Sequence, residues 1–244
     1  MNIDENKKWW DSLSLDWKVS FIKNLMLDIE EDLTSEDVLE RFNTSNYNID
    51  DIVNIEVLSI GVSLAIDLSP VFKLKNLNDF SIIPPDSNND EFGIEDFIFI
   101  YPKQLRDKVK KIKFCMPGYF NGNLNSLTDF VNLREINFQS CHISSLDGIQ
   151  NLNKLEKVTI DQGNFITDLS PLNGLKLKYL DVSFNDINDL SPLAGLPLEY
   201  LNIEGTNITD LYPIMGITTL KKLEFDNYDL VFEQLSGHPS LQQN

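Results

Sequence analysis

The chain has 244 residues, of which 42% are apolar and 24% are charged, a composition typical of a globular protein with one or two domains. Its 38 Asp and Glu residues against 20 Lys and Arg give a formal net charge of -18, which argues against nucleic acid and anionic membranes as partners and favours a basic partner. Two cysteines are too few for a disulfide scaffold, and no apolar run is long enough to span a membrane.

Residues 1–50 are predicted to form an N-terminal helical cap. A tryptophan-rich apolar stripe recurs there mostly at steps of three or four residues, the spacing of an amphipathic helix. Ser12 or Ser14 is expected to cap the main body of this helix, and Thr34 is expected to begin a second helix. We expect the tryptophans to pack against the first unit of the domain that follows, with a tryptophan-lined ligand pocket as the alternative.

The N-terminal sequence also bears on the compartment of the protein. It lacks the apolar core of a secretory signal, and the cysteine content fits a reducing environment. We therefore expect a cytoplasmic protein. An exported form stays open as the alternative if a leader precedes this sequence.

A repeated pattern begins near residue 51 and is irregular before residue 109. Asp67-Leu-Ser-Pro70 and the apolar residues after it have the spacing of an early copy. A polar segment at 84–93 is predicted to be an inserted loop, and Val109 begins the next copy.

From residue 133 the pattern LxxLxL recurs in register. Its five copies begin 22, 22, 21 and 22 residues apart, at Leu133, Leu155, Leu177, Leu198 and Leu220. A second pattern, D-L-x-P, recurs at spacings of 21, at Asp168, Asp189 and Asp210. The LxL part predicts a short strand whose leucines face inward, and the proline-containing half predicts a short return segment on the outer side. No copy can bury its leucines alone, so stacked copies must share one core.

These two patterns together resemble the leucine-rich repeat family, in the 22-residue subtype of bacterial internalins and of a eukaryotic phosphatase-regulatory subunit. The resemblance covers at least residues 109–230. It implies an α/β solenoid: a curved stack with short parallel strands on the concave face and 3-10, short helical or extended segments on the convex face. We expect seven or eight coils over residues 51–235, followed by a tail over 236–244. Cys141, Asn185 and Thr206 are expected at the corner after the strand, bonded to the backbone.

Catalytic and metal-binding patterns are missing from the sequence. It contains no phosphate-binding glycine loop, no nucleophile elbow and no zinc-binding pair of histidines or cysteines. His142 beside Cys141 is a poor dyad, because adjacent residues on a turn point in different directions. The aspartates of D-L-x-P are expected to cap the outer turns rather than to bind calcium. We predict no catalytic residue, no cofactor and no metal.

The concave face is the predicted binding surface, because the side chains between the inward leucines project there together. Stacked strands place them in columns, one of Asn137, Thr159, Asp181, Asn202 and Glu224 and one of Gln139, Asp161, Ser183, Glu204 and Asp226. Aromatic anchors among carboxylates favour binding of a protein. The predicted partner-binding residues are Asp161, Tyr179, Asp181, Phe184, Tyr200, Asn202, Glu204, Glu224 and Asp226. The alternative is a solvated acidic face in which the tyrosines only fill a ladder.

We therefore predict a non-catalytic protein-binding module that recognises a basic protein through this acidic and aromatic face. Three more specific uses stay open: an immunity or antitoxin-like inhibitor of a basic toxin, a regulatory scaffold of an enzyme, and an internalin-like surface adhesin. A basic run between Lys103 and Lys113 could orient a partner or favour self-association, so we expect a monomer or weak self-association.

Overall fold

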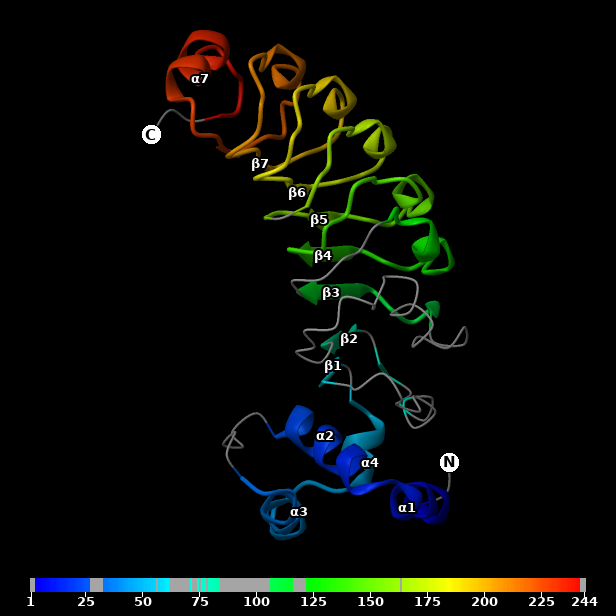
Figure 1. Cartoon of the computed structure of the whole chain (residues 1–244). Helices are drawn as coiled ribbons and strands as arrows, with labels where there is room; N and C mark the ends of the chain where they lie inside the picture. Colours follow the sequence, from blue (N-terminus) through cyan, green and yellow to red (C-terminus); the bar gives the residue numbers. More distant parts are fainter. Residues whose placement is uncertain are drawn as a thin grey trace.

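The protein is a curved stack of coils with a helical cap at its N-terminal end. The computed structural model describes residues 3–26, 33–55, 57–61, 71, 74, 76, 77, 79–83, 106–115, 122–162 and 164–241. The strands follow the inner side of the arc, and the short 3-10 segments follow its outer side (Figure 1). The loop predicted at 84–93 and the early Asp67–Pro70 copy lie outside the described residues.

In the described part of the chain four helices precede the strands, which confirms the predicted N-terminal helices. They are α1 (Ile3–Ser12), α2 (Leu15–Leu25), α3 (Ser35–Thr44) and α4 (Ile49–Val53). The apolar stripe predicted as one helix is divided between α1 and α2, because the Ser14 side chain accepts a hydrogen bond from the Trp17 N–H, at 3.4 Å, and begins α2. Thr34 begins α3 in a capping box with Asp37, and Asn48 begins the short α4 in the same way.

The tryptophan rings join the helices of the cap to one another. The rings of Trp9 and Trp17 lie 5.6 and 5.1 Å from that of Phe21, and Trp10 lies 5.6 Å from Phe42 on α3. Such ring pairs stabilise the packing beyond the apolar area that they bury. These ring contacts of the tryptophans therefore join α1, α2 and α3 within the cap. Helix α2 in turn lies against the first strand.

The described residues contain eight parallel strands, one for each coil. They are β1 (Val57–Gly61), β2 (Asp79–Ile83), β3 (Lys111–Cys115), β4 (Glu135–Gln139), β5 (Lys157–Thr159), β6 (Tyr179–Asp181), β7 (Tyr200–Asn202) and β8 (Lys222–Glu224). Strands β1 and β2 pair with each other, and β3 to β8 form one six-stranded sheet in sequence order. Within each sheet every strand pairs with the next one along the chain, which confirms the predicted solenoid.

The outer side of each regular coil is a 3-10 turn, held in the later coils by the D-L-x-P aspartate. The turns are η2 (Asn125–Asp129), η3 (Ile149–Asn151), η4 (Ser170–Leu172), η5 (Ser191–Leu193) and η6 (Tyr212–Ile214). Asp168 accepts hydrogen bonds from the Ser170 N–H at 2.7 Å and from its hydroxyl at 2.6 Å, and these bonds hold the pKa of Asp168 below its usual range. Asp189 and Asp210 likewise accept from the backbone N–H two residues on, so each of these aspartates holds the start of an outer turn from one residue before its N-cap.

Asparagine side chains hold the corner after the strand. The Asn185 amide donates to the backbone oxygens of Ile160 and Val182, at 2.7 and 3.1 Å, and its oxygen accepts from the Ile166 N–H at 3.0 Å. Asn164 makes the same bridge one coil earlier, to Phe138 and Ile143. These bonds satisfy backbone groups that the turning chain leaves without a ladder partner.

The other two predicted corner residues have the same local role. Cys141 is buried and donates from Sγ to the backbone oxygen of Gln139 at 3.1 Å. The Thr206 hydroxyl donates to the backbone oxygen of Ile203 at 2.6 Å. Asn164 was missed at the sequence level because its coil has one more residue before the corner than its neighbours have.

Residues 236–241, the described part of the tail predicted over 236–244, pack on the last coil. They follow α7 (Tyr228–Leu235), whose Leu235 is buried. His238 is 7% exposed, and its Nδ1 accepts from the N–H groups of Ser240 and Leu241 at 3.3 and 3.2 Å. The Ser240 hydroxyl donates to the backbone oxygen of Leu220 at 2.8 Å. This segment therefore covers the end of the solenoid.

Within the described ranges, no helix has the length and apolar character needed to cross a bilayer.

Candidate functional site

The register of the six-stranded sheet aligns the concave side chains in columns. Equivalent positions of successive strands are direct partners, which confirms the predicted column of Asn137, Thr159, Asp181, Asn202 and Glu224. A neighbouring column contains Lys111, Glu135, Lys157, Tyr179, Tyr200 and Lys222. We call this neighbouring column the ladder, because each of its members contacts the next one.

The two tyrosines of the ladder stack on each other and have a lysine on either side, so that both faces of each ring are covered. Tyr179 and Tyr200 stack with ring centroids 4.2 Å apart and planes 6° from parallel. The Lys157 ammonium lies 4.5 Å from the Tyr179 centroid, and that of Lys222 lies 5.4 Å from the Tyr200 centroid. Glu135 pairs with both Lys111 and Lys157, at 3.1 and 3.5 Å. The rings thus present their edges rather than their faces to a partner.

The C-terminal end of the ladder is locked by a hydrogen bond. The Tyr200 hydroxyl donates to Glu224 Oε2 at 2.5 Å, and Lys222 lies 2.5 Å from the same carboxylate. Burial, followed by the bond to Glu224, raises the pKa of Tyr200 well above its usual range. The bond from Lys222 and then that from Tyr200 lower the pKa of Glu224. Tyr200 is therefore a fixed hydroxyl donor and Glu224 a fixed carboxylate.

Beside the ladder lies what we call the acidic strip, formed by Asp161, Asp181, Glu204 and Asp226. Asp181 is buried and accepts from the Ser183 N–H and hydroxyl, at 3.1 and 2.7 Å. Glu204 is half-buried and Asp226 is exposed. The side chains of the predicted site thus differ in their exposure to solvent, because those of Asp161, Asp181 and Asn202 are less than a tenth exposed.

Asp161 is the least satisfied carboxylate of the strip. Its Oδ2 accepts from Gln139 Nε2 at 3.3 Å, while its buried Oδ1 has no hydrogen-bond partner among the described residues. Burial raises the pKa of Asp161, and repulsion from Asp181 adds to this shift while the bond from Gln139 opposes it. The strip therefore holds its negative charge at a cost in stability.

Phe184 lies past the end of β6, at the corner of the coil. Its backbone is left-handed, with a φ of 56°, and its side chain is 54% exposed. The ring stands over Gly205 of the next coil, where an added Cβ would lie 2.5 Å from the ring Cδ1. The Gly205 N–H in turn donates to Asp226 Oδ2 at 3.2 Å. Phe184 thus borders the acidic strip at the edge of the concave face.

Among the described residues, no group of three or more His, Cys, Asp or Glu is arranged to hold a metal ion.

Comparisons with known proteins agree with this geometry. The family described as Leucine Rich repeats (2 copies) matches residues 131–174, the coils around β4 and β5. Residues 131–174 therefore match leucine-rich repeats, and the chain has the fold of a leucine-rich repeat solenoid. Two crystal structures from Listeria monocytogenes share its solenoid fold. Internalin C2 is 21% identical to this chain with a TM-score of 0.52, and the match covers 87% of this chain and 86% of internalin C2. Internalin F is 19% identical with a TM-score of 0.53, and the match covers 90% of this chain and 72% of internalin F.

No curated protein matches the sequence of this chain at a significant level.

A second exposed ring in the solenoid was missed at the sequence level. Phe165 follows the corner residue Asn164, is 53% exposed and stacks on His142, with ring centroids 5.4 Å apart. The signal was an apolar residue directly after a corner asparagine, and the extra residue in this coil concealed it.

We expect Asp161→Asn to raise the melting temperature of the protein by roughly 1–3 °C near neutral pH. The folded-state pKa of Asp161 is raised, so ionisation of this carboxylate costs stability above that pKa. As the pH falls through the folded-state pKa the native carboxylate becomes protonated, and the advantage of the variant should shrink. Thermal unfolding at about pH 7.5 and about pH 4 measures both effects.

The exposed Asp147 on the outer side provides the control, as Asp147→Asn should leave the melting temperature unchanged. An Asp161→Asn variant that melts below the native protein at both pH values would contradict the prediction.

Proposed function

We propose that this protein is a binding module without catalytic activity that holds a basic protein partner on the acidic strip. One observation carries the proposal. Within the described residues, none of the four carboxylates of the acidic strip forms an ion pair, whereas the lysines of the ladder are paired with Glu135 and Glu224. The half-buried Glu204 and the exposed Asp226 therefore offer negative charge to a partner, next to the buried Asp161 and Asp181.

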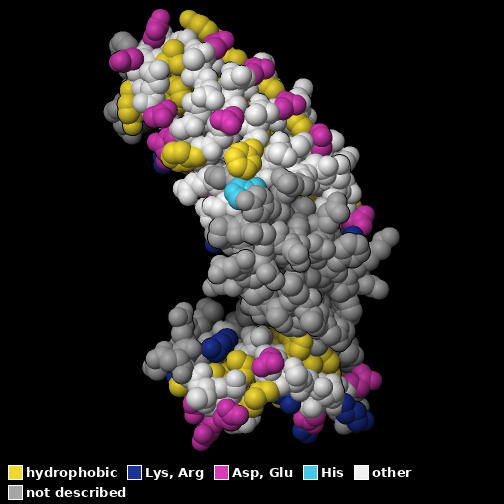
Figure 2. Space-filling view, in the orientation of Figure 1, with side chains coloured by type: hydrophobic (Ala, Val, Ile, Leu, Met, Phe, Trp, Pro, Cys, Tyr) yellow, Lys and Arg dark blue, Asp and Glu magenta, His cyan; other side chains and the backbone are white. Residues whose placement is uncertain are grey.

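A second row of ion pairs engages further basic side chains and leaves the carboxylates of the acidic strip without ion-pair partners among the described residues. On the side of the ladder away from the strip, Arg134 pairs with Glu156 at 2.5 Å, Glu156 with Lys178 at 3.6 Å, and Glu199 with Lys221 at 2.5 Å. Residues 180–244 contain ten Asp and Glu and two Lys, and both of those lysines are in these pairs or in the ladder. Among the charged side chains visible at this end of the molecule in Figure 2, acidic ones predominate. Such a field attracts basic proteins and speeds their association.

The architecture also supports a binding role. Stacked repeats form an extended concave surface on a rigid frame, and solenoid proteins commonly use such a surface to bind partners. Inhibition of a basic toxin, regulation of an enzyme and adhesion all use such a surface, so the identity of the partner separates them. We place the activity in the cytoplasm, and the compartment of the captured partner tests that assignment.

Charge reversal on the strip tests the proposal. We expect Glu204→Lys to weaken capture of the partner by about tenfold or more, because it replaces a negative charge of the strip with a positive one. The immobilised native protein and the variant are incubated with a lysate of the source cell at low and moderate salt. Retained proteins are identified by mass spectrometry, and the affinity of the purified partner is then measured.

Asp147→Lys is the matched control, since it makes the same charge change on the exposed outer side and should keep the partner. Equal melting temperatures must show that both variants fold. A partner kept equally by Glu204→Lys, or one that carries no excess of positive charge, would refute the proposal.

A further inference from the structure

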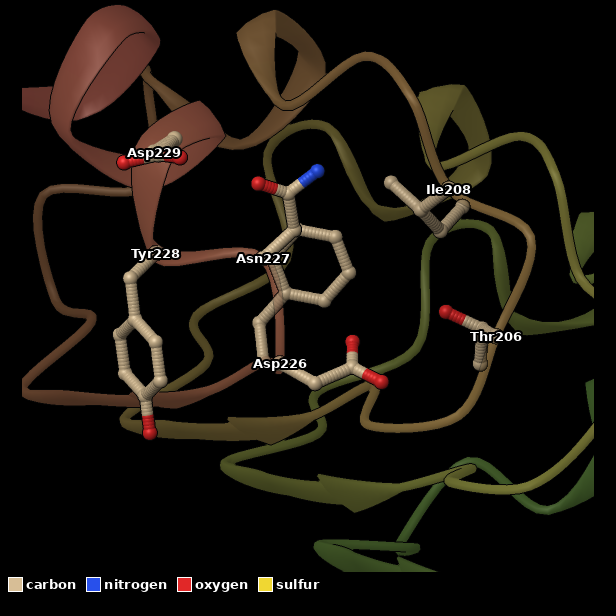
Figure 3. Close-up of a pocket in the computed structure, with 7 residues that line it drawn as sticks. Thr206, Ile208, Asp226, Asn227, Tyr228 and Asp229 are labelled. Atoms are coloured by element: carbon tan, nitrogen blue, oxygen red, sulfur yellow. The ribbon is translucent and has the colours of Figure 1, made fainter.

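A pocket opens at the C-terminal end of the acidic strip, between the corner of the β7 coil and the start of α7. Its volume is 580 Å³, within the usual range for ligand pockets. It is lined by Thr206, Ile208, Phe225, Asp226, Asn227, Tyr228 and Asp229. In Figure 3, Asp226 points across the pocket toward Thr206, and Tyr228 stands on the other side with its ring free of the labelled neighbours.

The walls of the pocket combine apolar surface with carboxylates. Ile208 and the buried Phe225 form an apolar wall, and the Tyr228 side chain is 75% exposed. Asp226 receives one N–H bond, from Gly205, and Asp229 lies exposed in the first turn of α7. An elongated side chain with a cationic end would find an apolar wall for its stem and carboxylates for its charge.

No Lys or Arg among the described residues lines this pocket. In the part of the chain that the structure describes after Asp181, the basic residues are Lys221 and Lys222, and each is 2.5 Å from its own partner, Glu199 or Glu224. The charge of Asp226 and Asp229 is thus complementary to a group that comes from outside.

We propose that this pocket receives an arginine side chain of the basic partner; the inference rests on the proposed function. Arginine is favoured over lysine because its planar guanidinium can stack on an exposed ring while it donates to carboxylates. Tyr228 supplies the ring, and Asp226 and Asp229 supply the acceptors. Phe184, which stands over Gly205 beside Asp226, extends the apolar surface toward the concave face.

Three small probes test the pocket directly on the full chain. They are N-acetyl-arginine methylamide, its lysine analogue and its citrulline analogue, which keeps the shape of arginine without the charge. Binding is followed through the backbone amide resonances of Gly205, Asn227 and Tyr228. We expect saturable shifts of these amides with the arginine probe, a weaker affinity for lysine, and an affinity for citrulline that is lower by about tenfold.

Two variants separate recognition in the pocket from the general negative field. Asp226→Asn and Tyr228→Ala should each weaken the arginine probe several-fold. Glu233→Gln is the control for Asp226→Asn, because it also removes one exposed negative charge, from α7 but outside the pocket. It should leave the affinity nearly unchanged, and all variants must keep the native melting temperature.

The outcomes of these measurements are distinct. Equal binding of arginine and citrulline, equal weakening by Asp226→Asn and Glu233→Gln, or an absence of saturable shifts would overturn the pocket assignment. If the arginine probe does not bind in the pocket while the Glu204→Lys variant no longer retains the partner, the proposed function stands without the pocket assignment. If arginine binds in the pocket while Glu204→Lys keeps the partner, the pocket stands and the proposed function fails.

Discussion

Asn185→Ala should lower the free energy of unfolding by about 3–4 kcal/mol, one of the two largest losses that we expect for a single substitution. The Asn185 side chain is 3% exposed and bridges two coils. Its amide donates to the oxygens of Ile160 and Val182, and its oxygen accepts from the Ile166 N–H. Alanine would leave these buried backbone groups without partners, which costs more than the loss of an exposed bond.

Urea unfolding followed by circular dichroism measures this loss. Asn207→Ala is the control, because Asn207 is an exposed asparagine in the next coil, and it should change the free energy of unfolding by less than about 0.5 kcal/mol. A loss below about 1 kcal/mol for Asn185→Ala would show that water replaces the bridge.

Gly148→Ala is expected to destabilise the fold by at least about 3 kcal/mol. Gly148 has a φ of 105°, and a Cβ at this position would lie 2.5 Å from backbone atoms of Leu124 and Asn125. Since the clash is with main chain rather than with a flexible side chain, the two neighbouring coils would have to separate. The same denaturation experiment detects the change.

Gly174→Ala separates the clash from the strain of the backbone. Gly174 also has a positive φ, of 78°, but nothing lies within 4 Å of an added Cβ. This variant should lose only about 1 kcal/mol, the cost of a left-handed conformation for alanine. Equal losses in the two glycine variants would refute the steric explanation.

The concave columns could be predicted from the sequence because alternation along a strand decides which side chains face outward. The spacing of the leucines alone therefore places Asn137, Thr159 and Asp181 in one column, as the strand register confirms. The covering of the tyrosine rings could not be predicted in this way. It depends on the direction in which Lys157 and Lys222 extend toward the neighbouring coils, and residue spacing does not determine that direction.

Long-range contacts explain the other differences. His238 lies in a polar segment with glycine, proline and serine, which locally indicates a frayed end. Its burial depends on the preceding coils, where the Ile214 oxygen lies 3.3 Å from His238 Nε2 and the Leu220 oxygen accepts from Ser240. The pocket was missed for the same reason. Asp226 was predicted as a concave residue, but α7 brings Tyr228 and Asp229 beside it.

The ion pairs beside the ladder repeat with a period of two coils, whereas the backbone repeats with a period of one. From Arg134 to Lys221 the sign of the charge alternates at each step, through Glu156, Lys178 and Glu199. Duplication of a single coil would place two like charges side by side on adjacent strands. Duplication of a pair of coils would preserve the alternation. Gain or loss of two coils together would therefore keep these ion pairs, whereas gain or loss of one coil would break the alternation.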